Sequence, residues 1–380
     1  MLNFSEALGN LDNFNWYYKD DFEWKTKNYK KGRRIVYIGE KKDNPNYTVV
    51  FKKLKVENRF KEILKEIYFL SCCNKSKYFV KLVDIFLSED KNFIFLILKD
   101  EGINLLELIK YNGDEGNEED YFDYRNIPNI ICWITFQILC GLRILHAKQL
   151  IHQDIKPGNV LISSKSVVKI CDFGSVDIIG TNSFGTTCYE SPRNLLGNNT
   201  NDEKDDIWSV GVIMIELFKK SFPFFNWKAI SNSEINKKQS QLKSILFHYK
   251  ITVNNNEINI NDNFQFELIK NMISENNFEK FEEELLDIGI EGQENQDALN
   301  ALDLIKNLLK IDPSKRFSAE QALKHNYFTQ YIDNFKENIN IISFKTDDYN
   351  RFCQIINSKN DFLKNVELIK QKFIGEVIIN

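Results

Sequence analysis

The pattern of apolar and polar positions changes along the chain, and its first quarter alternates as strands do. Residues 24–55 contain two runs rich in β-branched and aromatic side chains, RRIVYIG and YTVVFKKLK, separated by the polar run KKDNPN at 41–46. Such runs predict strands joined by a turn. Two further strands are expected near 79–87 and 92–98.

The rest of the pattern is mainly helical. Residues 57–70 are apolar at helical spacing, at Phe60, Ile63, Leu64, Ile67 and Leu70. Residues 129–147 and 206–218 are apolar nearly all round, which predicts two buried helices. The short runs VLIS and VVKIC between them read as strands. An acidic loop is expected at 113–120, and the Asn-rich stretch 230–300 contains one amphipathic helix around Phe278, Phe281, Leu285 and Ile288.

A β-rich first quarter before a helical remainder predicts an α+β protein with two lobes.

Charge and residue composition narrow the class of protein further. The net charge of −4 argues against a basic nucleic-acid-binding surface. Apolar runs are strand-sized rather than membrane-sized, and the N-terminus has no basic start followed by an apolar stretch, so neither a membrane span nor a secretory signal is expected. The seven cysteines are scattered without a C-x-x-C pair and there are four histidines, which disfavours disulfide and zinc frameworks and fits a reducing compartment.

Two short motifs carry the candidate chemistry. The run HQDIKPGN at 152–159 is followed by DFG at 172–174, and together they supply carboxylates, an amide and a lysine on adjacent loops. Oxygen ligands of this kind suit a divalent metal and leave one carboxylate to accept a proton. Phosphoryl transfer needs both functions. Either motif alone could be an ordinary surface turn, but both in this order favour the chemical interpretation.

These motifs resemble those of the eukaryotic Ser/Thr protein kinases. HQDIKPGN is similar to the catalytic loop H-R-D-x-K-x-x-N, and DFG is intact. The resemblance implies a bilobal fold, with a small β-rich N-lobe and a large, mainly helical C-lobe. It implies Asp154 as the catalytic base, Asn159 and Asp172 as Mg²⁺ ligands, Lys156 as a contact to the γ-phosphate of ATP, and Leu161 as the floor under adenine.

The resemblance continues upstream of the catalytic loop. The run VVFK at 49–52 is similar to the V-A-I-K strand of kinases, so Lys52 is expected to hold the α- and β-phosphates, and Val50 belongs to the same nucleotide-binding strand. The ion-pair partner of Lys52 is expected to be Glu66, with Glu62, one turn earlier, as the alternative.

The glycine-rich loop ahead of Lys52 departs from the family pattern. Kinases carry G-x-G-x-x-G-x-V there, whereas this chain offers only Gly32, with Val36 or Tyr37 to roof the adenine. Because glycines let backbone amides approach phosphate closely, the loss of two puts nucleotide affinity in question.

Downstream motifs extend the resemblance over about residues 25–330. GTTCYESP at 185–192 is similar to the end of a kinase activation loop, and implies that Thr186 bonds Asp154 and Lys156. DIWSVG at 206–211 resembles the start of the central helix, whose Asp206 would hold the catalytic loop through backbone hydrogen bonds. In DPSKRFSAEQALKHNYF at 312–328, Ser318 and Gln321 form a capping box.

The expected domain organisation follows from these landmarks. It comprises an N-terminal extension (1–20), an N-lobe (21–99), a C-lobe (100–330) with the insertion at about 230–300, and a C-terminal tail (331–380). The insertion lies where cyclin-dependent, MAP, casein-kinase-II and Cdc7-type kinases carry extra helices.

Three departures bear on regulation and specificity. Gln153 replaces the arginine that receives an activation-loop phosphate, so activity is expected not to need phosphorylation there. Gly158 replaces a glutamate that basophilic kinases use, so a basic substrate preference is not supported. Arg193 replaces the glutamate that pairs with the arginine at 316, which puts two positive charges in place of an ion pair.

The two arginines give a specific expectation. Either Arg193 swings to solvent, or Arg316 finds another acid, with Glu190 and Asp312 nearest in sequence. In both cases the activation segment is expected to be tethered less firmly than in other family members, and Arg193→Glu to stabilise the protein.

Two functions from different classes remain. The first is an active Ser/Thr kinase that transfers the γ-phosphate of Mg-ATP to protein hydroxyls; a kinase acting on a small molecule is a minor variant of it. The second is a pseudokinase scaffold that keeps the fold and has lost efficient turnover. A regulatory protein could bind the 230–300 insertion or the 331–380 tail, no nucleic-acid or membrane partner is expected, and the expected location is intracellular, cytoplasmic or nuclear.

Overall fold

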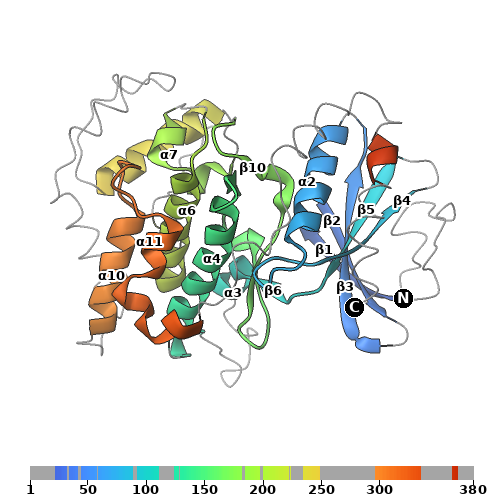
Figure 1. Cartoon of the computed structure of the whole chain (residues 1–380), viewed down its shortest axis with the longest axis horizontal. Helices are drawn as coiled ribbons and strands as arrows, with labels where there is room; N and C mark the ends of the chain where they lie inside the picture. Colours follow the sequence, from blue (N-terminus) through green and yellow to red (C-terminus); the bar gives the residue numbers. More distant parts are fainter. Residues whose placement is uncertain are drawn as a thin grey trace. The chain divides into compact units, whose positions relative to one another are not determined.

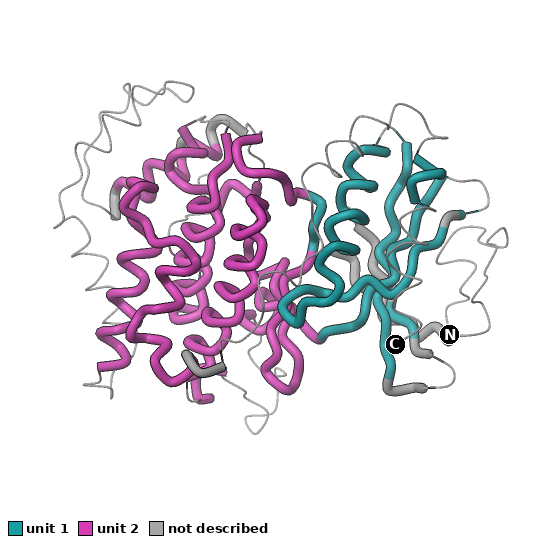
Figure 2. Tube along the Cα trace, viewed as in Figure 1, with its two compact units in different colours: residues 1–101, 172–174, 340–380 teal, residues 102–171, 175–339 magenta. Residues whose placement is uncertain are grey.

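The computed structural model of the chain describes residues 22–31, 34–41, 44–57, 59–88, 92–110, 124–127, 129–181, 185–196, 200–221, 223, 234–248, 296–334 and 362–366. The chain divides into two compact units (Figure 2). Unit 1 comprises residues 1–101, 172–174 and 340–380, and unit 2 comprises residues 102–171 and 175–339. No helix in the described ranges is both long and apolar enough to cross a bilayer.

Unit 1 is built on a five-stranded antiparallel sheet in the order β1-β2-β3-β5-β4 (Figure 1). The strands are β1 (Phe22–Lys31), β2 (Arg34–Lys41), β3 (Asn44–Lys55), β4 (Leu82–Leu87) and β5 (Phe93–Lys99). On one face of the central pair β3 and β5, Val49, Phe51, Phe95 and Ile97 form a buried cluster. The strand predictions are confirmed, with β4 starting later than expected and β3 taking in the end of the predicted turn.

Helix α2 (Phe60–Cys73) also belongs to unit 1 and is the helix expected at 57–70. Ile63, Leu64 and Ile67 are almost fully buried, whereas Phe60 at the first position is half-buried. A further helical turn at 362–366 lies in the same unit, so part of the predicted C-terminal tail packs with the first lobe.

Unit 2 is mainly helical. Its longer helices are α4 (Ile130–His146), α6 (Glu203–Lys219), α7 (Glu234–His248) and α10 (Gln296–Leu308), with the shorter α3 (Leu105–Lys110), α5 (Pro192–Leu195) and α11 (Ala319–Leu323). Helix α4 packs against α6 and α11, and nearly all its residues are buried, as its all-round apolar pattern predicts. The expected capping box of Ser318 and Gln321 is present at α11.

Short strands in unit 2 hold the loop that carries the candidate chemistry. β7 (Leu150–Ile151) pairs with β10 (Asp177–Ile178), and β6 (Ile103–Asn104), β8 (Val160–Ile162) and β9 (Val168–Ile170) form a three-stranded sheet. The loop 152–159 therefore leaves one strand pair and enters another, so both of its ends are fixed.

The insertion differs from its prediction in part. Helix α7 begins inside it and α10 begins at its end, and neither helix was predicted. The amphipathic helix expected around Phe278–Ile288 and the acidic loop expected at 113–120 lie outside the described residues.

Candidate active site

The charged cluster of unit 1 is centred on Lys52. Its ammonium, on β3, donates to the carboxylate of Glu66 on α2 and to Oδ1 of Asp172 at 3.0 Å. Lys52 and Glu66 are almost completely buried, at 7% and 5% exposure. One buried cation is thus held by two carboxylates, and charge-assisted bonds of this kind are the strong ones in a dry setting.

The pairing decides between the two glutamates proposed for Lys52. Glu62 is exposed and accepts a hydrogen bond from Arg59 at 2.8 Å, one turn away on the same helix. Glu66 faces inward to Lys52. Glu66 is therefore the partner, as expected.

The backbone before Phe173 is held in an unusual conformation. Asp172 has φ of 66°, in the left-handed region that residues other than glycine seldom adopt. The next side chain, Phe173, is fully buried and its ring meets that of Phe79 edge-on at 5.5 Å. The anchored ring fixes the turn and so directs the carboxylate of Asp172 at Lys52, a use of backbone strain that is common at functional sites.

A second polar cluster lies in the loop of unit 2. Thr186 Oγ1 is 2.6 Å from Oδ1 of Asp154, and Lys156 Nζ is 2.7 Å from Thr186 Oγ1 and 2.6 Å from Oδ2 of Asp154. The hydroxyl donates to the carboxylate and accepts from the ammonium, which closes a ring of three bonds. The predicted bonds of Thr186 to Asp154 and Lys156 are confirmed.

Asn159 adds a fourth member to this cluster. Its Nδ2 donates to Oδ2 of Asp154 at 2.9 Å and to the Asp154 carbonyl at 2.8 Å. Asp154 therefore accepts from three side chains, and its carboxylate orientation is fixed before any substrate arrives. Such preorganisation is what an aligned catalytic carboxylate requires.

Asp206, on α6, fixes the backbone at the start of the loop 152–159. Its carboxylate accepts from the backbone N–H groups of His152 at 2.8 Å and Gln153 at 2.9 Å, and Nε2 of His146 lies 2.9 Å from it. Gln153 has φ of 68°, and this left-handed turn points successive N–H groups toward one acceptor. The expected role of Asp206 is confirmed.

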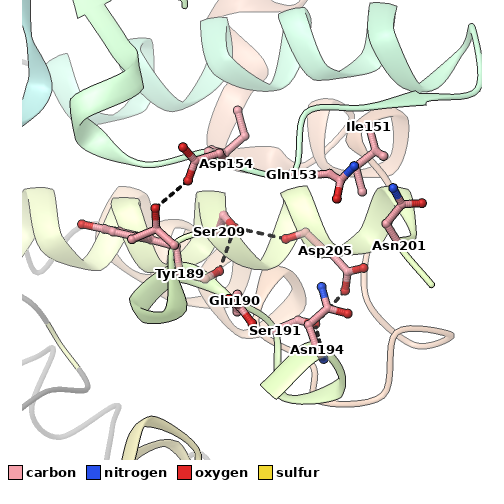
Figure 3. Close-up of a pocket in the computed structure, with 12 residues that line it drawn as sticks. Ile151, Gln153, Asp154, Tyr189, Glu190, Ser191, Asn194, Asn201, Asp205 and Ser209 are labelled. Atoms are coloured by element: carbon pink, nitrogen blue, oxygen red, sulfur yellow. Dashed lines mark hydrogen bonds between the residues drawn. The ribbon is translucent and has the colours of Figure 1, made fainter. Parts of the chain in front are cut away.

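The activation segment lies close against the same loop. A Cβ added to Gly185 would be 2.8 Å from the Gln153 carbonyl, so glycine is needed for this approach. Further along, Ser209 donates to the carbonyl of Tyr189 at 2.8 Å, and a pocket lined by Gln153, Asp154 and Tyr189, among others, lies beside these bonds (Figure 3).

Tyr189 also reaches a buried carboxylate. Its hydroxyl donates to Oε2 of Glu216, on α6, at 2.8 Å. Burial raises the pKa of Glu216 above its usual value, partly offset by the bond from Tyr189 and by the charge of Lys110. Burial, reinforced by the neighbouring Glu216, likewise raises the pKa of Tyr189 far above its usual range, so its hydroxyl keeps its proton and remains a donor.

The expectation that Arg193 swings to solvent and that the activation segment is loosely tethered is wrong. Its Nη2 donates to Oδ2 of Asp205 at 2.7 Å and to the Thr200 carbonyl at 3.1 Å, and its side chain is only 12% exposed. It neither swings to solvent nor leaves the segment loosely tethered. Asp205, on the first turn of α6, also accepts from Ser191 at 2.6 Å, so one carboxylate anchors the segment at two points.

Arg316 is accommodated in a different way. It donates to the backbone carbonyls of Lys204, Lys310 and Ile311, at 2.7, 2.8 and 3.1 Å. Its guanidinium also lies 5.1 Å from the ring centroid of the buried Trp208. Carbonyl dipoles and an aromatic face therefore stabilise this buried charge.

Helix α7 contributes two bonds that sequence reasoning missed. Lys238 lies 2.8 Å from the carboxylate of Glu190, and Gln241 donates to the carbonyl of Cys188 at 3.0 Å. Glu190, which was expected to be a partner for Arg316, pairs with Lys238 instead. No motif marks these two residues, which are polar positions of a helix that carries no kinase signature.

The remaining candidate residues have less defined surroundings. Gly32 lies outside the described residues, and Val36 is described only as a strand residue that pairs with Lys52 in the β2–β3 register. Val50 on β3 and Leu161 on β8 are half-buried. Their contacts to a nucleotide stay predictions.

The oxygen donors suit a hard cation. Asp172 and Asn159 offer a carboxylate and an amide, the ligand types that Mg²⁺ takes. Within the described ranges, no group of three or more His, Cys, Asp or Glu side chains gathers as a self-sufficient metal site.

Comparison with known proteins gives a consistent result. Residues 35–328 match the family model described as protein kinase domain. A Ser/Thr-protein kinase of Candida albicans, named SSN3, is 31% identical to the chain over 281 residues, which is 69% of this chain and 44% of that protein. The chain thus spans less than half the length of this relative.

Proposed function

Because the chain belongs to the protein kinase domain family, we propose that it is an active Ser/Thr protein kinase that transfers the γ-phosphate of Mg-ATP to protein hydroxyls. The observation that carries the proposal is the closed ring of Asp154, Lys156 and Thr186. A carboxylate held this way is poised to align a substrate hydroxyl and accept its proton.

Each charged residue has a role in this reaction. Lys52, held by Glu66, binds the α- and β-phosphates of ATP. Lys156 stabilises charge on the transferring γ-phosphoryl group. Asp172 and Asn159 would hold the Mg²⁺, which when bound neutralises charge on the phosphates. Val50, Leu161, Gly32 and Val36 are assigned to the nucleotide on the resemblance alone.

The pseudokinase alternative now rests on the eroded glycine loop. Arg193, which also favoured that alternative, forms an ion pair with Asp205 that anchors the activation segment. All six charged or amide groups of the reaction are present, and those of each unit have defined partners. These defined partners therefore support a catalytic role over a scaffold role.

The proposal also includes a regulatory partner protein and a location of the chain in the cell. The described part of the insertion, α7, contacts the activation segment, so a regulatory protein that binds the insertion could act on substrate alignment. None of the six cysteines in the described ranges forms a disulfide, as a reducing intracellular compartment would favour. We place the protein inside the cell, in cytoplasm or nucleus.

The experiment is γ-phosphate transfer to an array of Ser- and Thr-containing peptides, with Mg-ATP binding measured beside it. Wild type is expected to label peptides, and Asp154→Asn to bind Mg-ATP without labelling them. Mg-ATP binding without transfer by wild type would favour the scaffold.

A further inference from the structure

Helix α2 begins without the side-chain cap that α6 and α11 have, and α4 lacks one as well. The N-cap residue of α2, Arg59, makes no side-chain capping bond, whereas α6 and α11 each begin with a complete capping box. The first N–H groups of a helix have no partner inside the helix and are usually capped. The first turn of α2 must therefore be held mainly by packing.

That packing includes a residue from far along the chain. The ring of Phe60, the first residue of α2, lies 5.5 Å from the ring of Phe362, at an interplanar angle of 49°. Phe362 is fully buried. The family model ends at residue 328, so this contact comes from outside the part of the chain that the family shares.

The segment around Phe362 is shaped for one-sided contact. Residues 362–366 form a helical turn in which Phe362, Asn365 and Val366 are buried while Lys364 is exposed. Positions i, i+3 and i+4 share one face of a helix. The segment is thus a helical turn with one buried and one exposed face, and it belongs to unit 1.

We propose that residues 362–366 are a docking segment that binds the first turn of α2 within the same chain and thereby positions Glu66 for Lys52. Glu66 lies two turns into α2, and its inward direction depends on that helix staying wound and seated. Phe362 is a positioning residue in this account, since it acts through α2. The docking itself is independent of the proposed kinase activity; only its effect on nucleotide affinity rests on that activity.

Hydrogen exchange on the full-length chain tests the docking. Phe362→Ala should make amides of the first two turns of α2 exchange about tenfold faster or more, because burying a phenylalanine is worth at least that factor. Lys364→Ala, on the exposed side of the same turn, should leave exchange unchanged, and α6 in unit 2 serves as the internal reference. Equal exchange of α2 in wild type and Phe362→Ala would overturn the proposal, as would an equal acceleration of β3 and β5, which would indicate general destabilisation.

Rescue separates positioning from loss of fold. A synthetic peptide of residues 355–372, added to full-length Phe362→Ala, should restore slow exchange of α2, and the same peptide carrying Phe362→Ala should not. Phe362→Leu should keep most of the protection. Failure of the unmodified peptide to protect α2, together with a Phe362→Leu variant as unprotected as Phe362→Ala, would contradict the docking.

The link to Glu66 has its own readout. Phe362→Ala should raise the KM for ATP several-fold with a smaller change in kcat, and this rise should largely vanish in a Glu66→Gln background. Additive effects of the two substitutions on KM would contradict the link. If wild type transfers no phosphate, the proposed function fails, and hydrogen exchange still decides the docking.

Discussion

The two charged clusters of this protein are supported in different ways. In unit 2, Asp154 is held by three side chains, and the loop beneath it is held by a buried carboxylate on a capped helix. In unit 1, Lys52 and Glu66 form a strong pair, but Glu66 stands on a helix without a side-chain cap. The loop 152–159 is therefore fixed by its own hydrogen bonds, whereas the pair of Lys52 and Glu66 depends on how α2 packs.

The largest effect that probes the unit 1 cluster is expected from Lys52→Met. Removing one preorganised cation from a phosphoryl-transfer site should lower turnover by about 10²–10³-fold. Lys53→Met is the matched control, because Lys53 lies on the same strand over the ring of Phe93. Steady-state kinetics measures the turnover of both variants. Equal losses of turnover in the two variants would show that Lys52 has no special role.

The anchor of the activation segment in unit 2 predicts a loss of stability from Arg193→Glu. The substitution would place two carboxylates together where Arg193 and Asp205 now form a buried ion pair, at a cost of roughly 3 kcal/mol. This reverses the sign expected from the sequence. Thermal melts should show a clear drop relative to Lys315→Glu, which makes the same charge change at an exposed position. A melting temperature at or above that of wild type would show that the ion pair does not anchor the segment.

A smaller effect concerns the buried carboxylate of Glu216. The pKa of Glu216 is raised in the folded protein, so its charged form is disfavoured there. The stability that the protonated Glu216 gives the folded state is therefore lost as pH rises from about 4.5 through the raised value. Glu216→Gln keeps an acceptor for Tyr189 and removes the charge. The melting temperature of this variant minus that of wild type should therefore grow with pH across that window. A difference that stays constant with pH would refute the burial argument.

The smallest predicted effect concerns phosphate on the activation segment, which is expected not to change turnover. Since Thr186 already bonds Asp154 and Lys156, and Gln153 cannot neutralise a phosphate as arginine does, removing phosphate from Thr181, Ser183, Thr186 or Thr187 should leave turnover unchanged. Phosphatase treatment before assay tests this. Activity that falls and returns on rephosphorylation of one of these residues would show that the unit 2 cluster is not assembled by its own bonds.

Local sequence signals predicted much of the fold and the site. The apolar spacing located α2, α4 and α6, and the resemblance identified Glu66, Thr186 and the backbone bonds of Asp206, all of which the structure bears out. These succeed because each depends on short motifs whose residues contact neighbouring elements in a recurrent way.

The failures have physical reasons too. Helix α10 carries a clear apolar stripe at Ala301, Leu302 and Ile305, so the signal existed but was obscured by the surrounding polar sequence. Glu190 and Asp312 were considered only as acids for Arg316, whereas Asp205, twelve residues after Arg193 and on α6, pairs with Arg193 itself. Contacts such as Phe60 with Phe362 join distant segments without any motif, and only the folded chain reveals them.

The most direct test of the account is to measure Mg-ATP affinity and phosphate transfer for phosphatase-treated wild type and Asp154→Asn side by side. The account predicts that both proteins bind Mg-ATP with similar affinity, and that the variant transfers phosphate about 10²–10⁴-fold more slowly, because only the aligned carboxylate is lost. Equal transfer rates in the two proteins would contradict the role of Asp154, and Mg-ATP binding without any transfer by wild type would contradict the claim that this chain is an active kinase.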